Sequence, residues 1–168
     1  MPKTPKVEKN ISRVIVLSVG GTEEEYAGLT GIFAHSQWLL CPQSQWELKT
    51  CRSLDAALLM LRQKRVPIVI CERDLEDASW KALLEQAALL PDPPYLIVAS
   101  RQADEYLWAE ALNLGAYDVL AKPFETGEVL RVLSSAWLHR QNRRLAAAKG
   151  MLPAPRPQVR RNSRSAVA

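Results

Sequence analysis

The sequence of 168 residues predicts one α/β domain, in which a parallel sheet is covered by helices on both faces. Short segments rich in Val, Ile and Leu alternate five times with longer segments of helical periodicity. The connections between them are short, which favours parallel strands joined by crossover helices. With 48% hydrophobic and 24% charged residues, the chain has a globular composition and is long enough to bury a core without disulfides.

Five segments are predicted to be strands because they are apolar or alternating and are bounded by glycine, proline or polar residues. The runs VIVL at 14–17 and IVIC at 68–71 are continuous, which is typical of strands buried on both faces. The predicted strands cover 11–17, 46–51, 68–71, 95–99 and 119–121.

Helix starts are marked by side chains that can accept hydrogen bonds from first-turn amides. Thr22 and Glu25 have the spacing of a capping box, and Gly115 is placed to end a helix in the left-handed conformation. The predicted helices follow Thr22, Ser53 and Ser79, and then cover 104–114 and about 125–144.

Five alternating units predict a doubly wound, flavodoxin-like sheet with the strand order 2-1-3-4-5. In such a sheet, ligands bind beyond the carboxyl ends of the strands where the winding reverses. For strands 1 and 3, these ends carry Ser18, Val19 and Glu72. These residues are therefore the first candidates for a functional site.

The charge divides the chain into a mildly acidic body and a basic end. The net charge is +4, yet no Asp or Glu follows Glu128, and residues 140–168 contain eight cations. We expect a mobile leader at 1–10, a domain at 11–144 and a basic, Pro/Arg-rich tail at 145–168 that is disordered from about Gly150. The tail contains no aromatic residue, so any nucleic-acid contact through it would be weak and electrostatic.

Several function classes are excluded by what the sequence lacks. It has neither an apolar signal-peptide core nor a membrane-length apolar run, which predicts a cytoplasmic protein without a membrane partner. The cysteines at 41, 51 and 71 form no CxxC pair, and His35 and His139 have no second ligand nearby. With no Gly-rich phosphate loop and no nucleophile elbow, the chain is not expected to be an enzyme.

The segment 111–124, ALNLGAYDVLAKPF, resembles the closing segment of response-regulator receiver domains, A-x-x-x-G-A-x-D-[YF]-[LI]-x-K-P-[FL]. The resemblance covers about residues 11–140 and implies the receiver fold. It places the family's lysine at Lys122, makes Pro123 a candidate for a cis peptide bond, and places the hydroxyl that ends strand 4 at Ser100.

The other positions depart from the pattern of phosphorylated receivers. The phosphoacceptor aspartate falls on Glu72, the Mg²⁺-binding acid pair on Ser18 and Val19, and the switching aromatic residue on Val119. Mg²⁺ is held by oxygen ligands, usually carboxylates, so we expect its binding to be weak or absent and expect no cofactor. Glu is also one methylene longer than Asp, and an error near 1 Å in placement costs about 10²-fold in rate. The resemblance therefore implies a degenerate, pseudo-receiver type.

The sequence offers two other ways to complete a metal and phosphoryl site. Asp74 could be the acceptor if the strand were shifted by two residues, but this would bury Glu72 and Arg73 inside the sheet. The acids Glu23, Glu24 and Glu25 could supply ligands, but the helix start already explains them.

Glu72 and Lys122 are expected to face each other, either as a fixed substitute for phosphoaspartate or as a structural salt bridge without switching. Ser100 is expected either to form a hydrogen bond in the cleft at the strand ends or to cap a helix or turn. Trp80 either anchors a partner or packs against its loop, and Cys71 is expected to be a buried hydrophobe.

We predict a phosphorylation-independent interaction module in signal transduction, with signalling proteins or a second copy of the chain as partner. The expected surface is the face of strand 4, helix 4, strand 5 and helix 5, where exposed aromatics would support binding. Its aromatic residues are Tyr106, Trp108, Tyr117 and Trp137. The alternatives are a phosphoryl-accepting two-component switch of unusual chemistry and a nucleic-acid-binding regulator acting through the tail.

Overall fold

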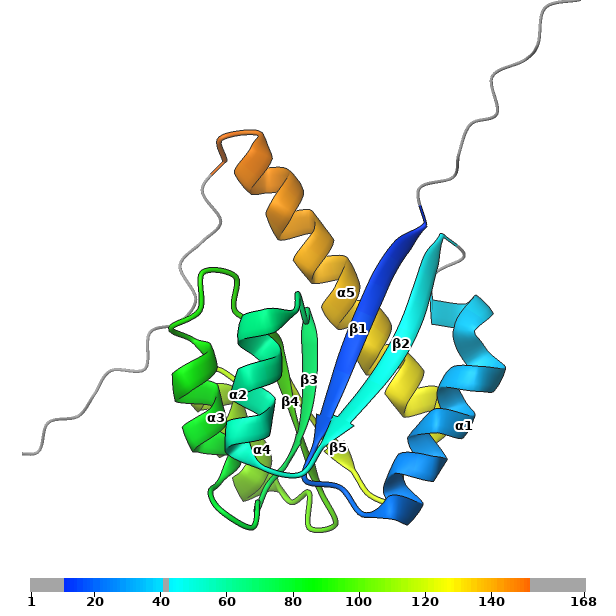
Figure 1. The fold of residues 1–168 in the computed structure, drawn as a ribbon, viewed down its shortest axis with the longest axis vertical. Coiled ribbons are helices and arrows are strands. Elements are labelled where there is room, and N and C mark those ends of the chain that lie inside the picture. Colours follow the sequence, from blue (N-terminus) through cyan, green and yellow to red (C-terminus); the bar gives the residue numbers. More distant parts are fainter. Residues whose placement is uncertain (1–10, 41–42, 152–168) are drawn as a thin grey trace, which may run out of the picture.

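The computed structural model describes residues 11–40 and 43–151 and contains one parallel sheet of five strands (Figure 1). The strand order is β2-β1-β3-β4-β5, which confirms the predicted order. The edge strands are therefore β2 and β5. The strands are β1 (Ser12–Val19), β2 (Ser44–Cys51), β3 (Ile68–Glu72), β4 (Tyr95–Ser100) and β5 (Asp118–Ala121).

Five helices cover the sheet, with α1 and α5 on one face and α2, α3 and α4 on the other (Figure 1). This is the doubly wound arrangement that the alternation of elements predicts. No helix within 11–40 and 43–151 is long and apolar enough to cross a bilayer. The helices are α1 (Glu23–Leu40), α2 (Leu54–Gln63), α3 (Trp80–Ala87), α4 (Glu105–Leu114) and α5 (Thr126–Ala148).

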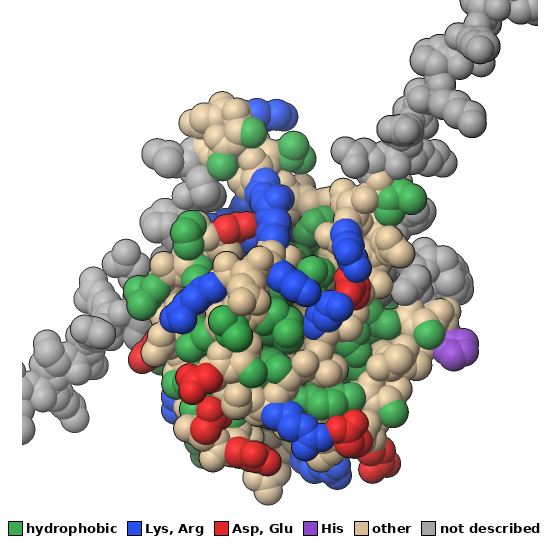
Figure 2. Space-filling view, in the orientation of Figure 1, with side chains coloured by type: hydrophobic (Ala, Val, Ile, Leu, Met, Phe, Trp, Pro, Cys, Tyr) green, Lys and Arg blue, Asp and Glu red, His purple; other side chains and the backbone are tan. Residues whose placement is uncertain are grey.

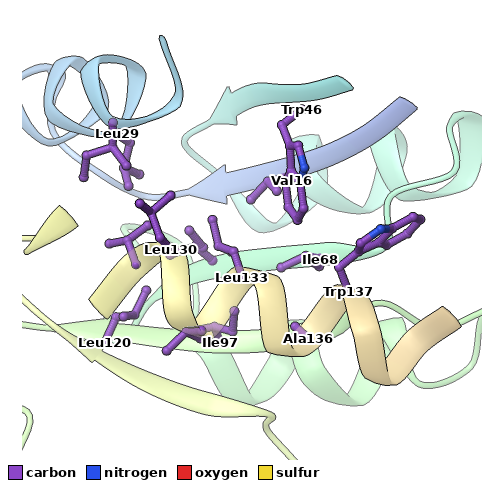
Figure 3. Packing of buried hydrophobic residues seen from close by; sticks show 14 of the residues in the cluster. Val16, Leu29, Trp46, Ile68, Ile97, Leu120, Leu130, Leu133, Ala136 and Trp137 are labelled. Atoms are coloured by element: carbon purple, nitrogen blue, oxygen red, sulfur yellow. The ribbon is translucent and has the colours of Figure 1, made fainter. Parts of the chain in front are cut away.

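Two hydrophobic layers form the core, one on each face of the sheet. Because side chains alternate along a strand, Ile68 and Ile70 of β3 enter the layer under α1 and α5, while Val69 and Cys71 enter the other. Figure 3 shows the first layer, in which Leu133 of α5 lies among side chains from the sheet. The central strands are thus buried on both faces, as their continuous apolar runs predict.

The predicted helix starts are confirmed at α1 and α2. The Glu25 amide donates to Thr22 Oγ1 (3.2 Å), and the Thr22 amide donates to Glu25 Oε2 (2.9 Å), which completes the capping box. Ser53 accepts from the Ala56 amide (3.2 Å). Ser79 precedes α3 as expected, but its side chain makes no capping hydrogen bond.

The C-terminal ends of two helices differ in how well the sequence predicts them. Gly115 ends α4 with φ of 100°, as predicted. Helix α5 continues to Ala148 rather than ending near residue 144, because three alanines, the best helix formers, follow Leu145. The predicted leader at 1–10 and most of the predicted tail, 152–168, lie outside the described residues, so the division into leader, domain and tail stays a prediction.

Arg140 is one of the eight cations of the basic end, residues 140–168, but its side chain is buried in the folded domain. Its side chain is 5% exposed, Nη1 donates to the Pro93 carbonyl (2.8 Å), and Nη2 lies 2.6 Å from Asp92 Oδ2. Burial lowers the pKa of Arg140 from its ordinary value, and Asp92 opposes this shift. Arg140 therefore connects the C-terminal half of α5 to the loop before β4.

Candidate functional site

The candidate site lies at the carboxyl ends of the parallel strands, where doubly wound sheets bind ligands. Glu72 is the last residue of β3, and Lys122 directly follows β5. Between these two strands runs β4, which pairs with both. The adjacent start of α1 supplies Glu25. The site thus combines residues that are up to 97 positions apart in the sequence.

Lys122 is held between two carboxylates. Its Nζ donates to Glu72 Oε2 (2.5 Å) and to Glu25 Oε1 (2.9 Å). The side chains of Lys122, Glu25 and Glu72 are 7%, 11% and 14% exposed, respectively. The predicted contact between Glu72 and Lys122 is therefore present, and the cation carries a second acidic partner.

Glu25 is the site residue that the sequence analysis missed. The capping box explains only one oxygen of this carboxylate, because Oε2 accepts from the Thr22 amide. The other oxygen, Oε1, accepts from Lys122 Nζ. Arg101 approaches the same Oε1 to 3.3 Å from the exposed side. The capping box itself was an available signal, because it fixes this carboxylate at the sheet edge where the other site residues converge.

The two carboxylates have opposite pKa shifts. Burial raises the pKa of Glu72 above its ordinary value, and the hydrogen bond and charge of Lys122 only partly oppose this. Burial also acts to raise the pKa of Glu25, but contacts with Lys122, Thr22 and Arg101 outweigh it, so that the net pKa is lowered. Glu25 is therefore the more firmly ionised partner of the lysine.

The positions expected to replace the acid pair do not form a cation site. Ser18 and Val19 are both buried in β1, and Val19 belongs to the hydrophobic layer on the α2 side. The residue that comes close to Glu72 is Gly20, where an added Cβ would lie 3.1 Å from Glu72 Cβ. Because Gly20 offers no side-chain oxygen and Lys122 already occupies the carboxylates, these residues do not fit Mg²⁺, which prefers octahedral oxygen coordination.

Asp74, the alternative acceptor, lies beyond β3 with an exposed side chain and forms an isolated backbone bridge with Ser79. The strand register therefore keeps Glu72 at the strand end.

Ser100 is buried, and its Oγ accepts from the Gln102 amide (3.1 Å), which is the turn-capping role. Val119 is fully buried in the core, and the Lys122–Pro123 bond is cis, as the resemblance implied.

The aromatic residues of the predicted interaction surface differ in exposure. Tyr106 on α4 is 86% exposed, whereas Trp108 and Tyr117 are partly buried and Trp137 is buried. Tyr106 is thus the aromatic residue of this set that is open to a partner.

Elsewhere, Trp80 and Cys71 are buried, and burial raises the pKa of the Cys71 thiol well above its ordinary value.

Replacing Glu25 by Gln is expected to lower the free energy of unfolding by about 1–3 kcal/mol at neutral pH, because a charged hydrogen-bond partner of Lys122 is lost. The folded-state pKa of Glu25 is lowered, so its stabilisation is present above the unfolded-state pKa and is lost as pH falls through the folded-state value. The difference in the free energy of unfolding between E25Q and the unmodified chain should therefore shrink as the pH is lowered. Urea unfolding at a series of pH values measures this difference.

The matched control is Glu24→Gln, an exposed residue in the same helical turn. Both changes remove one charge from the helix start, so both lose the same interaction with the helix dipole. Equal losses in E24Q and E25Q would contradict the role of Glu25 at Lys122.

The strand order, the five helices and a lysine held at the carboxyl edge of the sheet define the fold of a response-regulator receiver domain. The chain is similar to the signal receiver domain of an HD domain-containing protein from Pseudomonas fluorescens Pf-5. The two are 24% identical, with a TM-score of 0.65, over 77% of this chain and 98% of the other.

Two further solved structures show the same likeness. The chemotaxis response regulator CheY4 of Vibrio cholerae is 15% identical, with a TM-score of 0.62, over 74% of this chain and 99% of that one. The receiver domain of a sensor histidine kinase from Pseudomonas aeruginosa, with magnesium coordinated in its cleft, is also 15% identical, with a TM-score of 0.60, over 74% of this chain and 97% of that one. No protein-family model and no curated protein matches the sequence. At these identities the likeness establishes the fold.

Proposed function

We propose that this chain is a receiver-type signalling domain that works as a protein-interaction module without being phosphorylated. The observation that carries the proposal is the contact of Lys122 with both Glu25 and Glu72. The resemblance to phosphorylated receivers implies that, in those domains, the equivalent lysine neutralises charge on the transferring phosphoryl group. Here, two built-in carboxylates already hold it, so the domain has one fixed arrangement of this lysine.

Phosphoryl transfer to Glu72 is disfavoured by the same geometry. The transferring group carries negative charge that must be stabilised by cations, and a carboxylate nucleophile must be placed in line with it. The Glu72 carboxylate is bound to Lys122, and the neighbouring Glu25 carboxylate would repel a phosphoryl group. Neither Val19 nor Gly20 offers a side-chain carboxylate for a metal ion that could offset this repulsion.

The proposed partner surface is centred on Tyr106 of α4. This side chain borders a hollow of about 310 Å³ that is also lined by Arg73, Asp104 and Glu110. An exposed aromatic ring surrounded by charged side chains resembles the anchor and polar rim of a protein interface. A signalling protein or a second copy of the chain would therefore contact this face.

The test is an amide NMR titration of the full chain with Mg²⁺, followed by beryllofluoride, which mimics an acyl phosphate. We expect no saturable shift at Gly20, Glu72, Ser100 or Lys122, because the carboxylates are engaged and oxygen ligands are missing. A receiver domain that can be phosphorylated, used in its unphosphorylated form, serves as the positive control for the reagents.

Saturable shifts at Glu72 and Lys122 that vanish in Glu72→Gln would contradict phosphorylation independence. Shifts that persist in E72Q would instead report cation binding that does not use the Glu72 carboxylate. They would leave the proposal intact.

A further inference from the structure

A pocket of about 220 Å³ lies at the amino-terminal end of the sheet, opposite the candidate site. We define the basic pocket by Arg13, Arg65, Trp137, Arg140 and Arg144, which line it. Figure 2 shows Lys and Arg side chains gathered over the upper half of one face, where β1 begins and α5 ends, while most acidic side chains lie lower. The two ends of the sheet thus differ in charge.

The arginines of the basic pocket are not neutralised by their acidic neighbours. Asp92 is shared by Arg65 (3.5 Å) and Arg140 (2.6 Å), so that one carboxylate faces two cations. Arg13 is 2.5 Å from Glu47, but Glu47 also binds Lys49 at 2.5 Å. Arg144 forms no ion pair within the described part of the chain. The pocket therefore retains excess positive charge.

Two of the side chains that line the pocket, Arg140 and Trp137, are more than nine-tenths buried and form its inner wall. The other three arginines are exposed, so their guanidinium groups are open to a ligand. Direct contacts with an anion are therefore expected from Arg13, Arg65 and Arg144, while the charge of Arg140 adds to the positive potential.

We propose that the basic pocket binds a phosphate group of an anionic ligand. Guanidinium groups match phosphate oxygens in bidentate geometry. The volume is below the roughly 300–1,000 Å³ of pockets for drug-sized molecules, which favours one or two phosphate groups over a whole nucleotide. A free phosphate anion and the backbone of a nucleic acid share this chemistry.

The experiment uses the full chain and two probes, sodium pyrophosphate by isothermal titration calorimetry and a fluorescent single-stranded DNA by anisotropy. Arg144→Glu is the test variant, and Arg131→Glu is its matched control, since both arginines are exposed on α5. Arg131 lies 13 residues earlier, about 20 Å along the helix and outside the pocket. Neither side chain forms an ion pair in the described residues, so both variants should fold.

We expect R144E to weaken binding by about tenfold or more, while R131E stays close to the unmodified chain. Loss with pyrophosphate identifies a free phosphate anion as a ligand, and loss with DNA alone identifies backbone phosphate. An equal loss of affinity in R131E would show that only net charge matters, and it would overturn the proposal that the basic pocket binds phosphate. Failure of both probes to bind would also overturn it.

Discussion

Replacing Lys122 by Met is expected to lower the free energy of unfolding by about 3–5 kcal/mol at neutral pH, the range for breaking a buried ion pair by removing one partner. Met keeps most of the apolar stem, so the loss comes from leaving Glu25 and Glu72 without their cation. Chemical denaturation with one probe of secondary structure and one of tryptophan fluorescence measures this change.

The pH dependence distinguishes uncompensated charge from lost packing. In K122M, both carboxylates lack their cation, so their folded-state pKa values rise and stability is lost as pH increases. The deficit should therefore be larger near about pH 8 than near about pH 5. A triple variant that adds E25Q and E72Q should recover most of the loss, and no recovery would mean that Lys122 acts through packing alone.

Trp80→Ala is expected to cost about 3–5 kcal/mol, the range for removing a large buried aromatic side chain. Trp80 is 1% exposed and packs in the layer under α2, α3 and α4. This burial supports the structural interpretation of Trp80 over a role as a partner anchor. Thermal unfolding monitored by far-ultraviolet circular dichroism measures the effect.

The matched comparison is Tyr106→Ala, which removes an exposed aromatic residue from α4. Its effect on stability should stay within about 0.5 kcal/mol, as for most surface substitutions. If Y106A unfolds as easily as W80A, Tyr106 is part of the core packing, and the partner surface proposed around it is wrong.

The fold was predictable because each local signal agreed with the others. The apolar runs at β3 and β4, the capping box at Thr22 and the left-handed Gly115 all point to the same alternation of strands and helices. Where a local signal was weak, the boundary was missed. The end of α5 depends on alanines that carry no amphipathic pattern but favour helix intrinsically.

The site was predictable only in part, because its contacts join distant segments. The resemblance gave Glu72 and Lys122, which meet as expected. Glu25 was not predicted as a site residue because the capping box already explains it, although a carboxylate has two oxygens and can serve two partners. The burial of Arg140 was not predicted because sequence alone does not show that it contacts Asp92 and Pro93.

Within residues 11–40 and 43–151, strand β2 pairs with β1 along eight residues and has no strand on its other side. An exposed strand edge invites pairing with a second chain and hence aggregation. Glu47 and Lys49 lie on this strand, and their charges disfavour close approach of another strand. The charges on β2 therefore disfavour extension of the sheet by a second chain along this edge.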